Sequence, residues 1–271
     1  MVKKLLAQSY VAFILLLIYL PIFLLIMFSF IDSRVVGVIG PNDTFTLDLY
    51  RRLFLNERAM TAVANTFTVA FVSSSLSTIL GTLGAIGIFY MKPLGKRIFE
   101  TLTQIPVINA EIVMALSLAV LFVFFGFYEP DFMTLVIGHI VLTVAFVYLS
   151  VKPKLQQMDP SIYEAALDLG ATPLKALWSV ILPQIFPGVV SGFVLAFTLS
   201  LDDFIITSFL KPSSGFDTLS TYVEAQLRVG IPPEIRALTT LIFLFAMVVL
   251  VVNYTLTGKG DKKNIHSMAH R

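Results

Sequence analysis

Six long apolar segments dominate this sequence, and each could cross a lipid bilayer as a helix. An α-helix rises about 1.5 Å per residue, so roughly 20 apolar residues cover the hydrocarbon core. The chain is 57% hydrophobic and 13% charged, beyond the apolar share of a soluble domain. We therefore expect an all-α integral membrane protein with six transmembrane helices. They are predicted at residues 10–30, 63–90, 99–127, 132–151, 189–210 and 235–256, the third being interrupted at Pro106.

The rest of the composition narrows the class of protein. The first apolar run, Leu5 to Phe30, is longer than a signal-peptide core and is interpreted as a retained span. With no cysteine and three histidines, no thiolate metal site or catalytic cluster is evident, and a net charge of +2 does not suggest nucleic acid. The sequence contains no G-x-x-x-x-G-K-[ST] phosphate loop, so ATP would have to bind to another polypeptide.

The lysines and arginines predict the orientation, because cytoplasmic loops carry an excess of them. With the N-terminus in the cytoplasm, twelve of the 19 basic residues fall on the inner side. Both termini are therefore expected in the cytoplasm, with one six-span domain over residues 1–257 and a cytoplasmic tail over 258–271. The inner basic residues are Lys3, Lys4, Lys92, Lys96, Arg97, Lys152, Lys154, Lys175, Lys259, Lys262, Lys263 and Arg271.

A polar segment between the fourth and fifth spans, residues 152–188, is predicted to form an ordered cytoplasmic hairpin. Ser161 and Glu164 have the spacing of a capping box, so a helix is expected to begin at Ser161. Gly170 can adopt the left-handed conformation that ends a helix cheaply. Between them, apolar positions repeat on one helical face. These are Ile162, Ala165, Ala166 and Leu169.

A second short helix is expected next, with Thr172 as its N-cap and Pro173 in its first turn. Pro183 is expected to close it. Two capped helices with sizeable apolar faces favour docking into a groove of a soluble partner. The alternative is a helix that rests on the membrane surface, which Glu164 and Asp168 on its polar face disfavour. The apolar stripe of the second helix comprises Leu174, Leu177, Trp178 and Ile181.

This hairpin resembles a known motif. The run Glu164-Ala165-Ala166, followed by Gly170-Ala171 and later by Ile181-Leu182-Pro183, is similar to the EAA loop of ABC-importer permeases. The resemblance implies that the loop 152–188 faces the cytoplasm and that its first helix is a coupling helix held in a cleft of the ATPase subunit. The ATPase-coupling residues that it implies are Glu164, Ala165, Ala166, Leu169 and Gly170.

Two further stretches narrow this resemblance, which covers nearly the whole chain. "NAEIVMALSLAVLF" at 109–122 and "LAFTLSLDDFIITSF" at 195–209 resemble spans of the second permease subunit of spermidine/putrescine (polyamine) ABC transporters. The family implies a bacterial cytoplasmic membrane protein that works with a second homologous permease subunit, an ATPase dimer and an external substrate-binding protein. It also implies that this chain binds no cofactor, and that ATP and Mg are held by the partner ATPase.

Two adjacent carboxylates, Asp202 and Asp203, lie inside the fifth predicted span. An ionised carboxylate near the membrane centre costs about 3 kcal/mol on insertion scales, so each needs compensation. Because adjacent residues of a helix point in different directions, the two cannot share one face. Asp203 lies in line with Ser200 and Thr207, and Asp202 lies in line with Thr198. We expect one acid to line a water-filled substrate pathway and the other to bond a neighbouring helix.

Glu111 is the third candidate for the pathway. It follows Pro106 and Asn109, and broken membrane helices expose backbone carbonyl groups at transport sites. Carboxylates and carbonyls are the groups that a cation such as an ammonium would meet. The alternative for all three acids is a buried hydrogen bond between helices, without contact to substrate.

Other polar residues in the spans are assigned to packing. His139 shares a face with Thr143 and is expected to be a packed, hydrogen-bonded histidine rather than a proton relay. Small residues of the second span, among them Ser73, Ser77 and Gly81, allow close helix contact, which we expect at a subunit interface.

The expected function is that of a permease subunit of an ATP-driven importer for polyamines. Importers of ferric iron, an inorganic anion or a compatible solute are the alternatives within this class, and carboxylates in the spans disfavour an anion. An ion-coupled secondary transporter should show inverted repeats and lack an ATPase-docking hairpin. A membrane-embedded enzyme should show a metal or nucleophile cluster.

Overall fold

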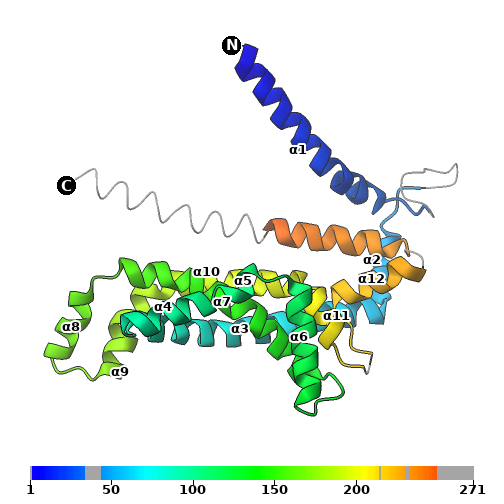
Figure 1. The fold of residues 1–271 in the computed structure, drawn as a ribbon. Coiled ribbons are helices and arrows are strands. Elements are labelled where there is room, and N and C mark those ends of the chain that lie inside the picture. Colours follow the sequence, from blue (N-terminus) through cyan, green and yellow to red (C-terminus); the bar gives the residue numbers. More distant parts are fainter. Residues whose placement is uncertain (1, 34–43, 214, 230–231, 249–271) are drawn as a thin grey trace. The chain divides into compact units, whose positions relative to one another are not determined.

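The structure is a computed structural model, and the part of the chain that it describes is almost entirely helical (Figure 1). The described residues are 2–33, 44–213, 215–229 and 232–248. No β-strand occurs among them, and a single β-bridge joins Ile31 to Phe45. The predicted all-α class is confirmed. The chain divides into two compact units, Met1–Met60 with Ala225–Arg271, and Thr61–Glu224.

The first unit contains α1 (Val2–Phe28), α2 (Asp48–Leu55) and a helical stretch over residues 234–248. Within α1, a stretch of 21 residues is long and apolar enough to cross a membrane, which confirms the first predicted apolar helix. In the stretch 234–248, the buried Arg236 guanidinium donates to the hydroxyl of Ser33 at 3.0 Å and to its carbonyl at 2.8 Å. The remainder of the sixth predicted span and the predicted tail 258–271 lie outside the described residues.

The second unit holds most of the long helices. Its elements are most of α3 (Glu57–Phe89), α4 (Pro93–Leu102), α5 (Ile105–Ile108), α6 (Glu111–Phe124), α7 (Phe132–Gln157), α8 (Pro160–Asp168), α9 (Pro173–Ala176), the π-helical turn η1 (Leu177–Ile181), α10 (Leu182–Asp202), α11 (Ile205–Leu210) and the first part of α12 (Leu219–Val229). α10 packs along α7, and α11 packs against both α6 and α7. Figure 1 shows α8 and α9 at one end of this unit, with α6 and α11 near the other.

Small residues let α3 approach its neighbours closely. A Cβ atom added at Gly81 would lie only 2.7 Å from Cβ of Val147 on α7. The buried hydroxyls of Ser77 and Thr143 are 2.7 Å apart, and Ser73 bonds a hydroxyl of α10. The predicted close packing of the second span is confirmed. For Ser73, Ser77 and Gly81 the expected subunit interface is wrong, because these residues contact α7 and α10 of the same chain. For Gly84, where an added Cβ would meet no atom within 4 Å, the interface stays a prediction.

The third predicted span, 99–127, is not one continuous helix. Its two parts, Pro93–Ile108 and Glu111–Phe124, are bent by 107°, as in a broken span or a re-entrant loop. The interruption was predicted at Pro106 but falls at Asn109 and Ala110, which are extended. Pro106 instead lies in the first turn of α5, where a missing N–H leaves no intrahelical bond unmade. The helices long and apolar enough to span within the described residues are Gln8–Phe28, Glu57–Phe89, Phe132–Gln157 and Pro173–Asp202, or five spans if the bent pair is added.

The fifth predicted span begins and ends earlier than expected. The helix runs from Pro173 through η1 to Asp202, so the prediction that Pro183 closes a separate helix is wrong. In η1, the N–H of Leu182 bonds to the carbonyl of Leu177, five residues back. This wider turn accommodates the proline ring, which would otherwise clash with the carbonyl four residues before it.

Candidate functional site

The predicted cytoplasmic hairpin contains a helix with a defined start and end. The side chain of Asp159 accepts the N–H of Ser161 at 2.9 Å, and this bonding holds the pKa of Asp159 below its ordinary value. The predicted capping box of Ser161 and Glu164 is therefore wrong. The cap lies two residues earlier, because Pro160 suits the first helical position and Asp159 suits the position before it.

The other end of α8 is closed at Gly170, as predicted, where φ is +84°. The N–H of Gly170 bonds to the carbonyl of Leu167 at 2.9 Å, and that of Ala171 bonds to Ala166 at 3.1 Å. This pair of bonds satisfies carbonyls that a helix end leaves unpaired. Thr172 then caps α9 with its side chain, which confirms the predicted restart.

The residues predicted to couple to an ATPase lie mainly on the outer surface of the hairpin. Ile162 and Leu169 are 47% and 89% exposed, which is high for apolar side chains outside a membrane span. Tyr163, by contrast, packs inward against the buried core of the second unit. α8 therefore presents an uncovered apolar surface, as docking sites commonly do. Of the predicted residues, Glu164, Ala165, Leu169 and Gly170 are exposed and Ala166 is half-buried.

The fifth span is broken beside its two carboxylates. α10 ends at Asp202 and α11 begins at Ile205, while Asp203 has an extended backbone with φ −65° and ψ 128°. The expectation that both acids lie within one continuous helix is therefore wrong. No proline or glycine occurs between Phe193 and Leu210, so the break depends on side-chain bonding instead.

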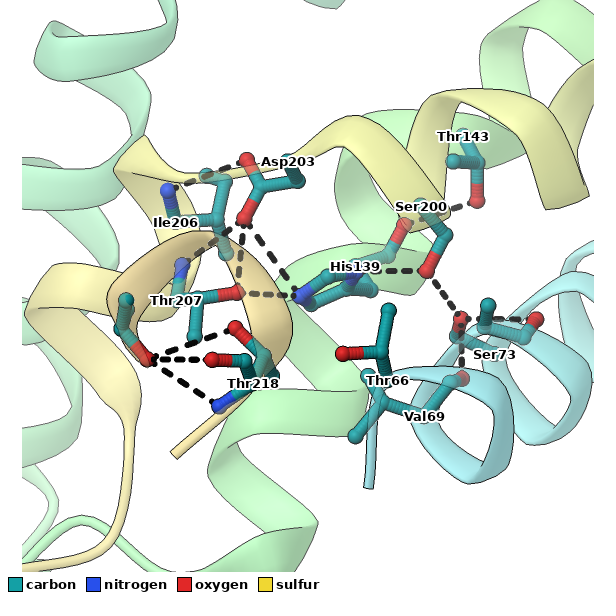
Figure 2. A network of polar contacts seen from close by, with 12 residues as sticks. Thr66, Val69, Ser73, His139, Thr143, Ser200, Asp203, Ile206, Thr207 and Thr218 are labelled. Carbon is teal, nitrogen blue, oxygen red and sulfur yellow. Dashed lines mark hydrogen bonds and ion pairs between the residues drawn. The ribbon is translucent and has the colours of Figure 1, made fainter. Parts of the chain in front are cut away.

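Asp203 supplies that bonding, because its buried carboxylate caps the start of α11 (Figure 2). Oδ1 accepts the N–H of Ile206 at 3.1 Å, and Oδ2 accepts the N–H and the hydroxyl of Thr207 at 2.8 and 2.9 Å. These donors replace the hydration that the carboxylate loses on burial. Asp203 is therefore fully engaged with its own chain.

His139 on α7 connects this cap to α10 and α3. Its Nε2 atom lies 3.1 Å from the hydroxyl of Thr207 and 3.5 Å from Oδ2 of Asp203. Its Nδ1 atom lies 2.7 Å from the hydroxyl of Ser200, which is 3.0 Å from that of Ser73 (Figure 2). Because the Thr207 hydroxyl donates to Asp203, its oxygen accepts from Nε2–H of His139. The prediction of a packed, hydrogen-bonded histidine is confirmed.

Asp202 has the opposite environment. Its side chain is exposed and has no hydrogen bond or ion pair to any residue that the structure describes. It ends an exposed stripe of α10 that also holds Ser191, Leu195 and Thr198. The C-terminal end of a helix carries unpaired carbonyl groups and partial negative charge. Asp202 and the end of α10 together suit a cation.

Glu111 is the first residue of α6, directly after the break in the third span. Its side chain is exposed, like those of Asn109 and Ala110 before it. α6 packs against α11, so the second half of the broken third span touches the short helix that follows Asp203. Within the described chain, no hydrogen bond or ion pair joins Glu111 to Asp202 or Asp203.

The sequence pattern does not reveal that Asp203 caps a helix. The signal of this cap is weak, because a capping carboxylate ordinarily accepts N–H groups two and three residues ahead, whereas Asp203 accepts those of Ile206 and Thr207, three and four residues ahead. The surrounding apolar run favours a continuous helix and hid that signal. Across the described ranges, no group of three or more His, Asp or Glu side chains could hold a metal ion.

Comparisons with known proteins agree on a class of transport protein. Residues 1–258 match the family described as "Binding-protein-dependent transport system inner membrane component". The putrescine transport system permease protein PotI of Escherichia coli K12 is 34% identical over 257 residues, covering 93% of this chain and 90% of that protein. The spermidine/putrescine transport system permease protein PotC of the same strain is 32% identical over 265 residues, covering 97% and 98%.

Solved structures share the fold. A bacterial ABC transporter involved in the import of the acidic polysaccharide alginate has a chain that superposes with a TM-score of 0.73 at 17% identity, covering 94% of this chain and 96% of its own. The MetNI methionine ABC transporter in an inward-facing conformation matches with a TM-score of 0.56 at 18% identity, covering 70% and 89%.

Proposed function

The chain belongs to the family of binding-protein-dependent transport system inner membrane components, and we propose that it is the subunit through which an ATP-driven importer moves polyamines into the cytoplasm. It is a permease subunit of an ABC importer and an integral protein of the inner membrane. The polyamine substrate, the use of ATP as the energy source and the role of each residue are our proposals.

The exposed carboxylate of Asp202 is the main observation in support of a polyamine substrate. A polyamine is a flexible chain of protonated amines, and each ammonium needs oxygen acceptors when it leaves water. Asp202 provides one beside the carbonyl end of α10, where a broken membrane helix favours cations. The sequence relatives at 32–34% identity, which are named as putrescine and spermidine/putrescine permeases, support the same choice. An anionic substrate would be repelled at this position.

We assign different roles to the three predicted pathway acids. Asp202 meets the substrate, and Glu111 meets it at the neighbouring broken span. Asp203 holds the break open by capping α11, because all of its bonding is used within the chain. It positions Asp202 and does not itself contact the polyamine.

Transport would require several partners. A second homologous permease subunit would complete the membrane pathway, an external binding protein would deliver the substrate, and an ATPase dimer would hold ATP and Mg. The ATPase would dock on α8 through Glu164, Ala165, Ala166, Leu169 and Gly170, from the cytoplasmic side where both chain termini lie. Its closure changes the permease only through contacts that differ between the two transport states.

Putrescine uptake into proteoliposomes tests this function, with the complex co-expressed and uptake normalised to assembled complex. Asp202→Asn keeps the shape of the side chain and removes its charge. We expect uptake to fall at least about tenfold, the equivalent of ~1.4 kcal/mol, while the yield of complex stays unchanged. Glu111→Gln should act in the same direction. Glu129→Gln, which neutralises an exposed acid in the loop between α6 and α7, is the matched control.

Two results would contradict the proposal. If both neutral variants took up putrescine at the parental rate, Asp202 and Glu111 would not line the substrate pathway. The polyamine assignment would be wrong if a compatible solute, an anion or ferric iron stimulated ATP hydrolysis and putrescine and spermidine did not. The orientation has its own test: single cysteines at Ser161 and Arg51 should react with an impermeant reagent from the inside and from the outside, respectively.

A further inference from the structure

The inward side of α8 packs against η1 and α9, and it also meets the end of α3 through an aromatic pair. The rings of Tyr163 on α8 and Tyr90, the residue after α3, have centroids 5.6 Å apart and planes inclined by 42°. Aromatic pairs favour centroid distances of about 4.5–7 Å in inclined arrangements. Tyr90 in turn meets the ring of Phe89 edge-on at 5.1 Å. α8 is therefore joined to the end of α3 by side chains far apart in sequence.

The same corner holds α4. Nζ of Lys96 lies 5.0 Å from the ring centroid of Phe89, within the range of a cation–π contact. One helical turn later, Glu100 forms an ion pair with Lys152 of α7 at 3.0 Å. Lys96 and Glu100 are four residues apart and so lie on one face of α4. That face is held at one point by the end of α3 and at another by α7.

α4 continues through α5 to the break before Glu111. The aromatic pair therefore stands at the start of a connected series of contacts from α8 to one of the two proposed pathway acids. A second connection leads along the chain from α9 through η1 and α10 to Asp202. That connection crosses the π-helical turn and Pro183, where regular helical hydrogen bonds are missing, so it transmits a displacement less stiffly.

We propose that Tyr163 and Tyr90 are positioning residues that transmit movement of α8 to α4 and thereby to the broken third span. This inference rests on the proposed docking of an ATPase on the outer face of α8. It divides α8 by function: Ile162 and Leu169 face the partner, and Tyr163 faces the permease. Losing the aromatic contact uncouples ATP hydrolysis from transport and leaves ATPase binding in place.

The test measures putrescine uptake per ATP hydrolysed in the assembled complex. Tyr163→Ala and Tyr90→Ala should each lower this ratio at least about fivefold, the lower end of usual coupling strengths, with the ATPase still co-purifying. The double variant should be no worse than either single one, because both remove the same contact. Tyr163→Phe and Tyr90→Phe keep the ring and should restore the ratio. Tyr128→Ala, which removes a 77% exposed tyrosine elsewhere, is the matched control.

Three results would overturn the proposal: a parental ratio in Tyr163→Ala, effects of the two alanine variants that multiply in the double variant, or phenylalanine variants as defective as the alanine ones.

A readout without substrate separates this inference from the polyamine assignment. The chain lacks cysteine, so Tyr90→Cys with Tyr163→Cys creates one pair for a short bismaleimide crosslinker. Because a contact that transmits movement must persist in both transport states, we expect equal crosslinking with and without nucleotide. Equal crosslinking in a complex that ignores putrescine supports the coupling role and rejects the substrate. Crosslinking that is lost when nucleotide binds rejects the coupling role.

Discussion

The two broken spans of this protein are built differently. In the third, the chain bends by 107° before Glu111, α6 begins without a side-chain cap, and the acid is exposed. In the fifth, Asp203 is buried, caps α11 and bonds through Thr207 and His139 to the neighbouring helices. The comparison teaches that an acid beside a helix break can hold the break together or can remain available to a substrate. Burial and bonding distinguish these roles, whereas position in the sequence does not.

The largest effect expected from this comparison is that of removing the buried acid. Asp203→Ala leaves two amides of α11 and the hydroxyl of Thr207 without their acceptor. Losing such a charged cap should cost about 3 kcal/mol. The measurement is the thermal unfolding midpoint of the purified complex in detergent, compared with Asp202→Ala. Equal midpoints for the two variants would show that the break does not need its cap.

Filling the contact between α11 and α7 should have the next largest effect. A Cβ atom at Gly138 would lie 2.5 Å from Cδ1 of Leu210 and 2.8 Å from Cγ2 of Ile206. The leucine tip can move, but the isoleucine methyl is held close to its backbone, so Gly138→Ala should destabilise by about 2 kcal/mol. Gly84→Ala is the control, because a Cβ there meets no atom within 4 Å. The same unfolding assay compares Gly138→Ala with Gly84→Ala. Equal unfolding midpoints for the two variants would mean that α11 is loosely packed against α7.

The smallest effect belongs to the exposed acid of the third span. Glu111→Gln removes only a favourable interaction with the positive end of α6, and this should cost no more than about 0.5 kcal/mol. Its unfolding midpoint should therefore match the parent, even where its putrescine uptake falls. A loss as large as that of Asp203→Ala would show that both breaks are held together in the same way.

The sequence predicts features that depend on length or on local bonding. Bilayer thickness sets the length of an apolar helix, and the caps at Gly170 and Thr172 require only neighbouring residues. The start of α8 was misplaced because Asp159 and Ser161 are both good caps, and Pro160 decides between them. The particular partners that meet from far apart in the sequence were not predicted.

The break at Asp203 depends on such a partner. It needs His139, which is more than 60 residues away along the chain, to complete the bonding around Thr207. The continuation of the helix through Pro183 needs a wide turn that no apolar pattern reveals. The different roles of Asp202 and Asp203 depend on both packing and the break. The sequence therefore identifies these two acids as pathway candidates but does not show which of them is buried.

The caps of α8 have a consequence for the thermodynamics of association. Asp159 orders the first turn and Gly170 the last, within the permease alone. The conformational entropy of this segment is therefore lost during folding of the permease and not at the encounter with an ATPase. A helix that formed only on docking would bind more weakly for the same contact area. The proposed ATPase site on α8 is thus a rigid one, and its affinity should change little when substitutions alter helix propensity alone.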